Sequence, residues 1–191
     1  MFFPAEEVVW RGRRDHDQGG HFTVERDTPA PSPVALLGVR SCDLRAVQIH
    51  DQVLSRRHYK DAHYTARRDG TMVIAVACGE PAATCFCASM HTGPRPAAVD
   101  PQTSEPSYDL LLTEVLGATG SDTTGSDTTG TEGDDGGHHF VVEIGTGAGR
   151  ELADAVEAAE GTEADRAAAI AITDAAAARQ TRAIEDRKSV V

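Results

Sequence analysis

Short apolar runs alternate with polar stretches along the first part of the chain. Two runs, residues 34–39 (VALLGV) and 72–77 (MVIAVA), are nearly continuous and have the length of buried parallel strands. Between them, apolar residues recur close to helical spacing from Asp43 to Leu54, and Ser41 or Asp43 is a suitable helix cap. The pattern therefore predicts a βαβ unit with a right-handed crossover and parallel strands.

Weaker patterns surround this unit. Residues 1–33 are polar and end in a proline-rich run, so we expect a partial N-terminal lead-in in extended conformation. A basic and aromatic loop is predicted over residues 56–68. Residues 108–115 and 139–144 are predicted to be two strands of a hairpin. Between them, residues 117–137 contain GSDTT twice in tandem and lack apolar side chains beyond Ala118, which predicts a disordered insertion.

The C-terminal part is rich in alanine. Residues 151–160 and 164–184 are good helix formers, but the second segment has few large apolar side chains to hold it to a core. The glycines at 145–149 favour a plain strand-to-helix turn over a dinucleotide-binding loop, because the third glycine of that motif is missing. We expect an α/β fold with a small parallel βαβ core, an added hairpin and a helical C-terminal connector. The expected domain spans residues 34–149 and the connector 150–185.

Charge and hydropathy exclude some functions. The net charge is −12, and it is uneven: residues 1–99 carry 12 Lys and Arg against 11 Asp and Glu, whereas residues 100–191 carry 6 against 19. An acidic surface repels nucleic acid, so no nucleic-acid partner is expected. No apolar run has the length of a membrane span, and the N-terminus lacks the pattern of a secretory signal. A cytoplasmic protein without membrane insertion is therefore expected.

The four cysteines are the candidate metal ligands or redox groups: Cys42, Cys78, Cys85 and Cys87. Cys42 follows the first predicted strand and Cys78 the second, so both should lie at the carboxyl edge of a parallel sheet, where ligands bind. Cys85 and Cys87 are in the loop that leaves Cys78. Four thiolates suit a soft metal, either zinc or an iron–sulfur cluster, and a helix start should favour the thiolate form of Cys42. Unrelated buried thiols remain the alternative.

Several blocks around these cysteines resemble one protein family. They are GVRSCDLRA at 38–46, YTARR at 64–68, CGEP at 78–81, TCFCASM at 84–90, TGPR at 92–95 and YDLLLT at 108–113. In this order they resemble the dicluster iron–sulfur proteins, which include the sulfhydrogenase beta subunit and the anaerobic sulfite reductase A subunit. The resemblance extends from about Phe3 to about Leu152, and the Cys-Phe-Cys block is its most specific part.

The resemblance implies electron transfer without catalysis by this chain itself. Members of the family pass electrons through [4Fe–4S] clusters, next to a flavin-containing subunit and a hydrogenase or sulfite-reducing subunit. Flavin is expected only on such a partner. The family's two ferredoxin-type clusters lie in a C-terminal domain with Cys-x2-Cys-x2-Cys runs, and this chain has no such run. A cluster on Cys42, Cys78, Cys85 and Cys87 is our own hypothesis.

Two alternative functions use the same residues. One is a docking scaffold that is stapled by zinc or is free of metal, although the Cys-x-Cys spacing differs from the usual zinc knuckle. The other is a thiol-disulfide protein that uses Cys85 and Cys87. In addition, the basic segment could attract a flavin or nucleotide phosphate, or an acidic partner, through Arg56, Arg57, Arg67 and Arg68. His58 and His63 in the same segment could bind a partner, although a solvated surface is the simpler interpretation.

The chain also departs from the family pattern. Ser41 stands where proline is common and His91 where glycine is usual. The family pattern normally begins upstream of this N-terminus, and residues 186–191 (DRKSVV) match the translated adapter sequence GAT CGG AAG AGC GTC GTG. We expect a fragment truncated at both ends, with 186–191 an artefact of sequencing. A genomic locus with a longer reading frame would support this hypothesis, and a stop codon directly after Val191 would contradict it.

Overall fold

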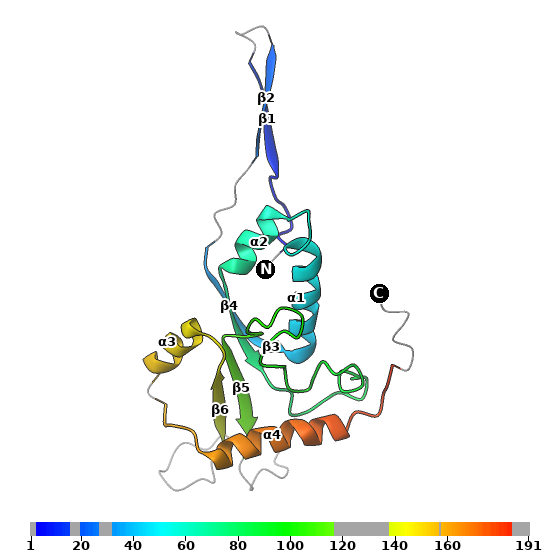
Figure 1. Ribbon diagram of the computed structural model, residues 1–191, viewed down its shortest axis with the longest axis vertical. Helices are drawn as coiled ribbons and strands as arrows, with labels where there is room; N and C mark the ends of the chain where they lie inside the picture. Colours follow the sequence, from blue (N-terminus) through cyan, green and yellow to red (C-terminus); the bar gives the residue numbers. More distant parts are fainter. Residues whose placement is uncertain (1–2, 16–19, 27–31, 117–137, 157, 185–191) are drawn as a thin grey trace, which may run out of the picture. The chain divides into compact units, whose positions relative to one another are not determined.

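A computed structural model describes residues 3–15, 20–26, 32–116, 138–156 and 158–184. The chain divides into two compact units (Figure 1). Unit 1 comprises residues 1–34 and 47–71, and unit 2 comprises residues 35–46 and 72–191. The predicted disordered insertion at 117–137 and the predicted artefact at 186–191 lie outside the described residues.

Unit 2 is built on a four-stranded mixed sheet with the order β3-β4-β5-β6. Strand β3 (Val34–Arg40) is parallel to β4 (Thr71–Val76), which is parallel to β5 (Leu110–Val115). Strand β6 (His139–Ile144) is antiparallel to β5, with Leu112 opposite Val142. The predicted α/β class, the βαβ unit and the hairpin of the last two strands are confirmed.

The apolar core of unit 2 gathers around β4 and β5. Its buried residues are Val39, Leu44, Val73, Ala75, Ala77, Tyr108 and Leu111. Ala75 and Leu111 are neighbours in the β4–β5 register, and both are fully shielded from solvent. The run at 34–39 was predicted to be a buried strand, but β3 lies at the edge of the sheet, and Leu37 is 74% exposed. An edge strand has a neighbour on one side only, so this prediction is wrong for most of β3.

Helix α3 (Gly147–Ala155) confirms the strand-to-helix turn after β6. The Thr146 side chain caps the helix by accepting the Gly149 N–H at 3.1 Å. A Cβ at Gly149 would lie 2.0 Å from the Asp109 carbonyl oxygen, so the first turn of α3 approaches the backbone before β5 more closely than any side chain allows. The helix begins four residues earlier than predicted because this cap precedes the alanine-rich segment.

Helix α4 (Glu163–Ala178) packs against β5 and β6 (Figure 1). Its start carries a capping box in which Thr162 and Asp165 satisfy each other's backbone N–H groups. The side chains that it buries are small and lie on one face of the helix: Ala169, Thr173 and Ala176. The expectation that few large apolar residues leave this segment without a core is therefore wrong, since small side chains let the helix approach the sheet closely.

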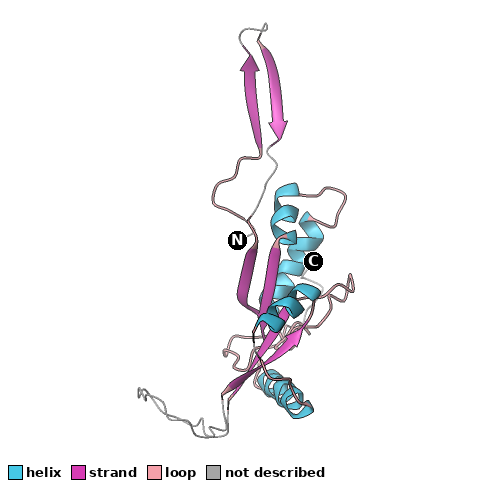
Figure 2. Ribbon diagram, turned by 90° about the vertical axis from the view of Figure 1, so that its left-hand side faces the viewer, coloured by secondary structure: helices cyan, strands magenta, loops and turns pink. Residues whose placement is uncertain are grey.

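Unit 1 contains an antiparallel ribbon that the sequence did not predict. Strands β1 (Trp10–Asp15) and β2 (His21–Arg26) pair from Trp10 opposite Arg26 to Asp15 opposite His21 (Figure 2). The described residues of the expected extended lead-in over residues 1–33 thus include a paired ribbon. All twelve strand residues are exposed, so the ribbon does not bury an apolar face in a core, which is the usual sign of a strand.

Two helices complete the described elements. Helix α1 (Ser41–Leu54) ends at the predicted residue and begins two residues before Asp43, so the two predicted caps lie in its first turn. The Asp43 carboxylate accepts the Arg40 N–H at 3.2 Å. Helix α2 (Ala62–Asp69) corrects the predicted loop over 56–68. A hydrogen bond joins this helix to α1: the Tyr64 hydroxyl donates to the Asp51 carboxylate at 2.7 Å. Both residues are buried and belong to unit 1.

Candidate functional site

The four cysteines all belong to unit 2 and come from three segments. Cys42 is the second residue of α1, the helix that directly follows β3, and Cys78 lies two residues after β4. Cys85 and Cys87 lie in the loop after Cys78, which has turns but neither helix nor strand. All four thiols are free of disulfides, with Cys42 exposed and the other three half-buried. The expected placement of Cys42 and Cys78 after two parallel strands is thus observed.

The carbonyl of Pro94 joins two of these segments. It accepts the Cys78 backbone N–H at 3.2 Å and the Ser41 hydroxyl at 2.5 Å. Ser41 is buried at the start of α1, so this contact ties the helix that carries Cys42 to the end of the cysteine loop. Ser41 was predicted as a possible helix cap, whereas its hydroxyl donates to the Pro94 carbonyl of the loop.

Gly93 provides the space in which the loop and α1 meet. A Cβ at this position would lie 2.8 Å from Ser41 Cβ and 3.1 Å from Cys87 Sγ. The Cys87 thiol therefore lies directly beside the start of the helix that carries Cys42.

Gln180, just after α4, contacts the cysteine loop from a distant part of the chain. Its side-chain Nε2 donates to Cys87 Sγ at 3.2 Å, and its Oε1 accepts the Ala88 N–H at 3.0 Å. Four residues later, the Ile184 N–H donates to the Ser89 hydroxyl at 3.2 Å. Sequence reasoning missed Gln180 because 93 residues separate it from Cys87 and no motif connects the two.

The protonation of Cys42 differs from the sequence expectation. Burial raises the pKa of the Cys42 thiol, and the neighbouring negative charge of Asp43 raises it further. Hydrogen bonds from backbone N–H groups at the helix start lower the pKa, as predicted, but they are weaker than the first two effects. The net direction is a raised pKa, so the helix start by itself does not favour the thiolate form of Cys42.

Cys78 and Cys85 are held by local contacts. The Cys78 thiol lies 3.6 Å from the Glu80 carbonyl oxygen, and the Cys85 N–H donates to the Ala82 carbonyl in a turn. In the described part of the chain, no group of three or more Cys, His, Asp or Glu side chains lies together as a metal site would require. The structure thus brings Cys42 and Cys87 near each other without gathering all four thiols at one point.

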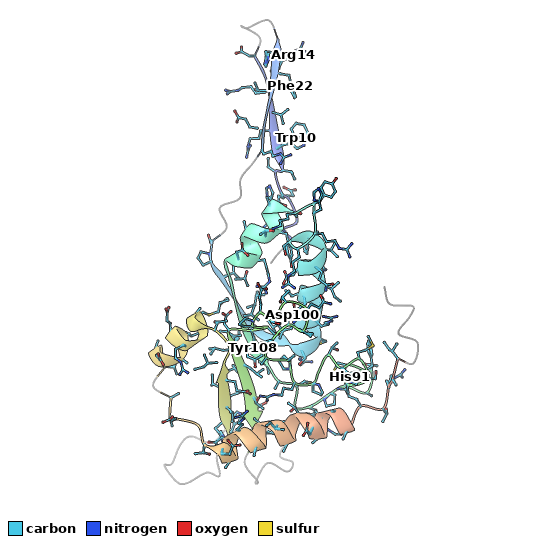
Figure 3. The ribbon with its side chains drawn as sticks, viewed as in Figure 1. Trp10, Arg14, Phe22, His91, Asp100 and Tyr108 are labelled. Carbon is cyan, nitrogen blue, oxygen red and sulfur yellow. The ribbon has the colours of Figure 1, made fainter. Side chains whose placement is uncertain are left out.

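His91 occupies a backbone conformation that usually belongs to glycine. Its φ is +55°, in the left-handed region, and it ends the turn in which its N–H donates to the Ala88 carbonyl (Figure 3). The side chain of His91 is exposed.

No family model, curated protein or solved structure matches this chain. The resemblance to dicluster iron–sulfur proteins thus stays a prediction. Among the helices that the structure describes, none has the length and apolar character needed to cross a membrane.

Proposed function

We propose that this chain is part of an iron–sulfur electron-transfer subunit, with Cys42, Cys78, Cys85 and Cys87 as ligands of a [4Fe–4S] cluster. The observation that supports this proposal best is that all four free thiols belong to one unit. They lie at a helix start, just after a strand, and in the loop that follows that strand. Four cysteine thiolates are the usual ligand set of such a cluster.

The site fits a cluster in its donor chemistry, because all four donors are free thiols of one unit. Cys42 lies at the start of a helix and Cys78 follows a strand, whereas Cys85 and Cys87 lie in a loop with turns. Gly93 leaves room for Cys87 beside α1, and Gln180 donates an N–H to its sulfur. Hydrogen bonds of this kind tune the reduction potential of iron–sulfur clusters.

The proposed partners are a flavin-containing subunit and a hydrogenase or sulfite-reducing subunit, in the cytoplasm. Phe86, between two of the proposed ligands, supports a docking role for this loop because its large apolar side chain is 45% exposed. An electron-transfer partner has to approach the ligands closely, and an apolar residue at that point would be covered by the contact.

Metal analysis tests this proposal directly. Iron, zinc and acid-labile sulfide are measured in the full chain after anaerobic reconstitution, beside a variant with all four cysteines changed to serine. The matched control is Thr84→Ala, which alters the same loop next to Cys85 but removes no thiol. We expect stoichiometric iron and sulfide in the native chain and in the control, and neither in the serine variant.

Each other outcome identifies a different function. Stoichiometric zinc without sulfide would make the chain a zinc-stapled scaffold. A chain that circular dichroism shows to be folded, but that retains no metal, would be a metal-free docking module. Iron and sulfide that persist in the serine variant would show that these residues are not the ligands.

A further inference from the structure

Unit 1 contains a cavity whose lining includes none of the four cysteines. It has a volume of about 700 Å³ and lies where the ribbon of β1 and β2 meets the segment that leads into α2. Trp10, Val24 and Arg26 line it from the ribbon, and Tyr59, Lys60 and His63 line it from the other side. This volume is within the range of small-molecule sites.

One face of the ribbon supplies the apolar wall of the cavity. Trp10 is opposite Arg26 in the register and Val24 is opposite Gly12, so these side chains share a face. Figure 3 shows Trp10 at the end of the ribbon away from Arg14 and Phe22. Trp10 is 57% exposed and Tyr59 86% exposed, which leaves both rings available for stacking.

The charges that line the cavity favour an anion. Arg26 and Lys60 lie on opposite walls, and in the described part of the chain neither has a carboxylate partner. The one carboxylate of the lining is Asp61, which is engaged as the cap of α2. Its Oδ1 accepts the N–H groups of His63 and Tyr64, each at 2.9 Å.

Contacts within unit 1 hold the two walls together. Glu7 lies three residues before Trp10, and its carboxylate binds His63 Nδ1 at 2.7 Å and the Arg67 guanidinium. Further toward the N-terminus, the ring of Phe3 stacks on Tyr64 with 5.7 Å between ring centroids. The segment that leads into β1 is therefore anchored on α2, so the ribbon wall has a defined position next to Tyr59 and Lys60.

We propose that this cavity binds a small aromatic anion of the nucleoside phosphate class. The planar ring lies against Trp10 and Tyr59, and the phosphate binds Arg26 and Lys60. This inference goes beyond electron transfer and is independent of it, since every residue involved belongs to unit 1 and none is a proposed cluster ligand.

Binding is measured on the full chain by calorimetry with two probes of different ring size, AMP and FMN. Their matched controls are adenosine and riboflavin, which keep the ring and lack the phosphate. Trp10 is the sole tryptophan, so quenching of its fluorescence by AMP reports on the cavity itself. We expect at least one probe to bind with a Kd below about 1 mM and its control about tenfold more weakly.

Variants locate the site. Arg26→Gln and Lys60→Gln should each weaken the binding of the phosphate probe about tenfold. Arg11→Gln removes the same charge from the opposite face of β1 and should change the affinity less than twofold. The proposal is overturned if neither probe binds up to several millimolar, if removal of the phosphate has no effect, or if Arg11→Gln weakens binding as much as Arg26→Gln. Circular dichroism of each variant establishes that it is folded.

Discussion

Gly93→Ala should destabilise the protein more than an ordinary surface substitution. The added Cβ would lie 2.8 Å from Ser41 Cβ, whereas carbon atoms pack at about 3.5 Å or more, so the contact is too short by about 0.7 Å. Ser41 cannot move away easily, because it is buried and its hydroxyl binds the Pro94 carbonyl. Overpacking of this kind costs about 1–3 kcal/mol.

Urea unfolding followed by far-ultraviolet circular dichroism measures this cost. With a slope of about 2 kcal/mol per molar urea, a loss of about 2 kcal/mol lowers the midpoint by about 1 M. The matched control is Gly161→Ala, whose Cβ would meet no atom within 4 Å, and it should stay within about 0.5 kcal/mol of the native protein.

A second substitution at Ser41 tests the cause. Ser41→Gly removes the Cβ that the new methyl group would meet, so Gly93→Ala should cost less in this background than in the native protein. Ser41→Ala keeps that Cβ and should not relieve the cost. The reasoning is refuted if Gly93→Ala unfolds at the same urea concentration as Gly161→Ala. It is also refuted if Gly93→Ala costs as much in the Ser41→Gly background as in the native protein.

Three further predictions concern contacts in both units. Tyr64→Phe should cost about 1–3 kcal/mol in urea unfolding, because it leaves the buried Asp51 carboxylate without its hydroxyl donor. Burial, followed by the hydrogen bond and charge of Asp51, raises the pKa of Tyr64, so the native protein should lose stability as the pH rises above about 10, and the Phe variant should lose less. Thr162→Ala should lower the free energy of unfolding by about 1 kcal/mol, since it removes the cap of α4, and an unchanged urea midpoint would contradict this role. Gln180→Leu should speed the reaction of Cys87 with a thiol reagent several-fold in the metal-free chain, and equal rates would show that Gln180 does not hold the loop.

Local patterns in the sequence were sufficient for much of unit 2. The apolar runs at 34–39 and 72–77 became adjacent parallel strands, and the strands predicted at 108–115 and 139–144 became β5 and β6. These predictions succeed because the period of a strand and the cap of a helix are properties of a few consecutive residues. They also placed Cys42 and Cys78 correctly, each just after a strand.

Only the tertiary structure decided how these elements are used. It placed β3 at the sheet edge and left it exposed, and it buried Tyr64 of α2 with its hydroxyl on Asp51 of α1. It also brought Gln180 to Cys87 across 93 residues of chain. Exposure, burial and side-chain partners depend on which segments meet in space, and a pattern of consecutive residues does not contain that information. For the same reason the sequence alone predicted the direction of the backbone effect on the Cys42 pKa, whereas the burial that outweighs it came from the fold.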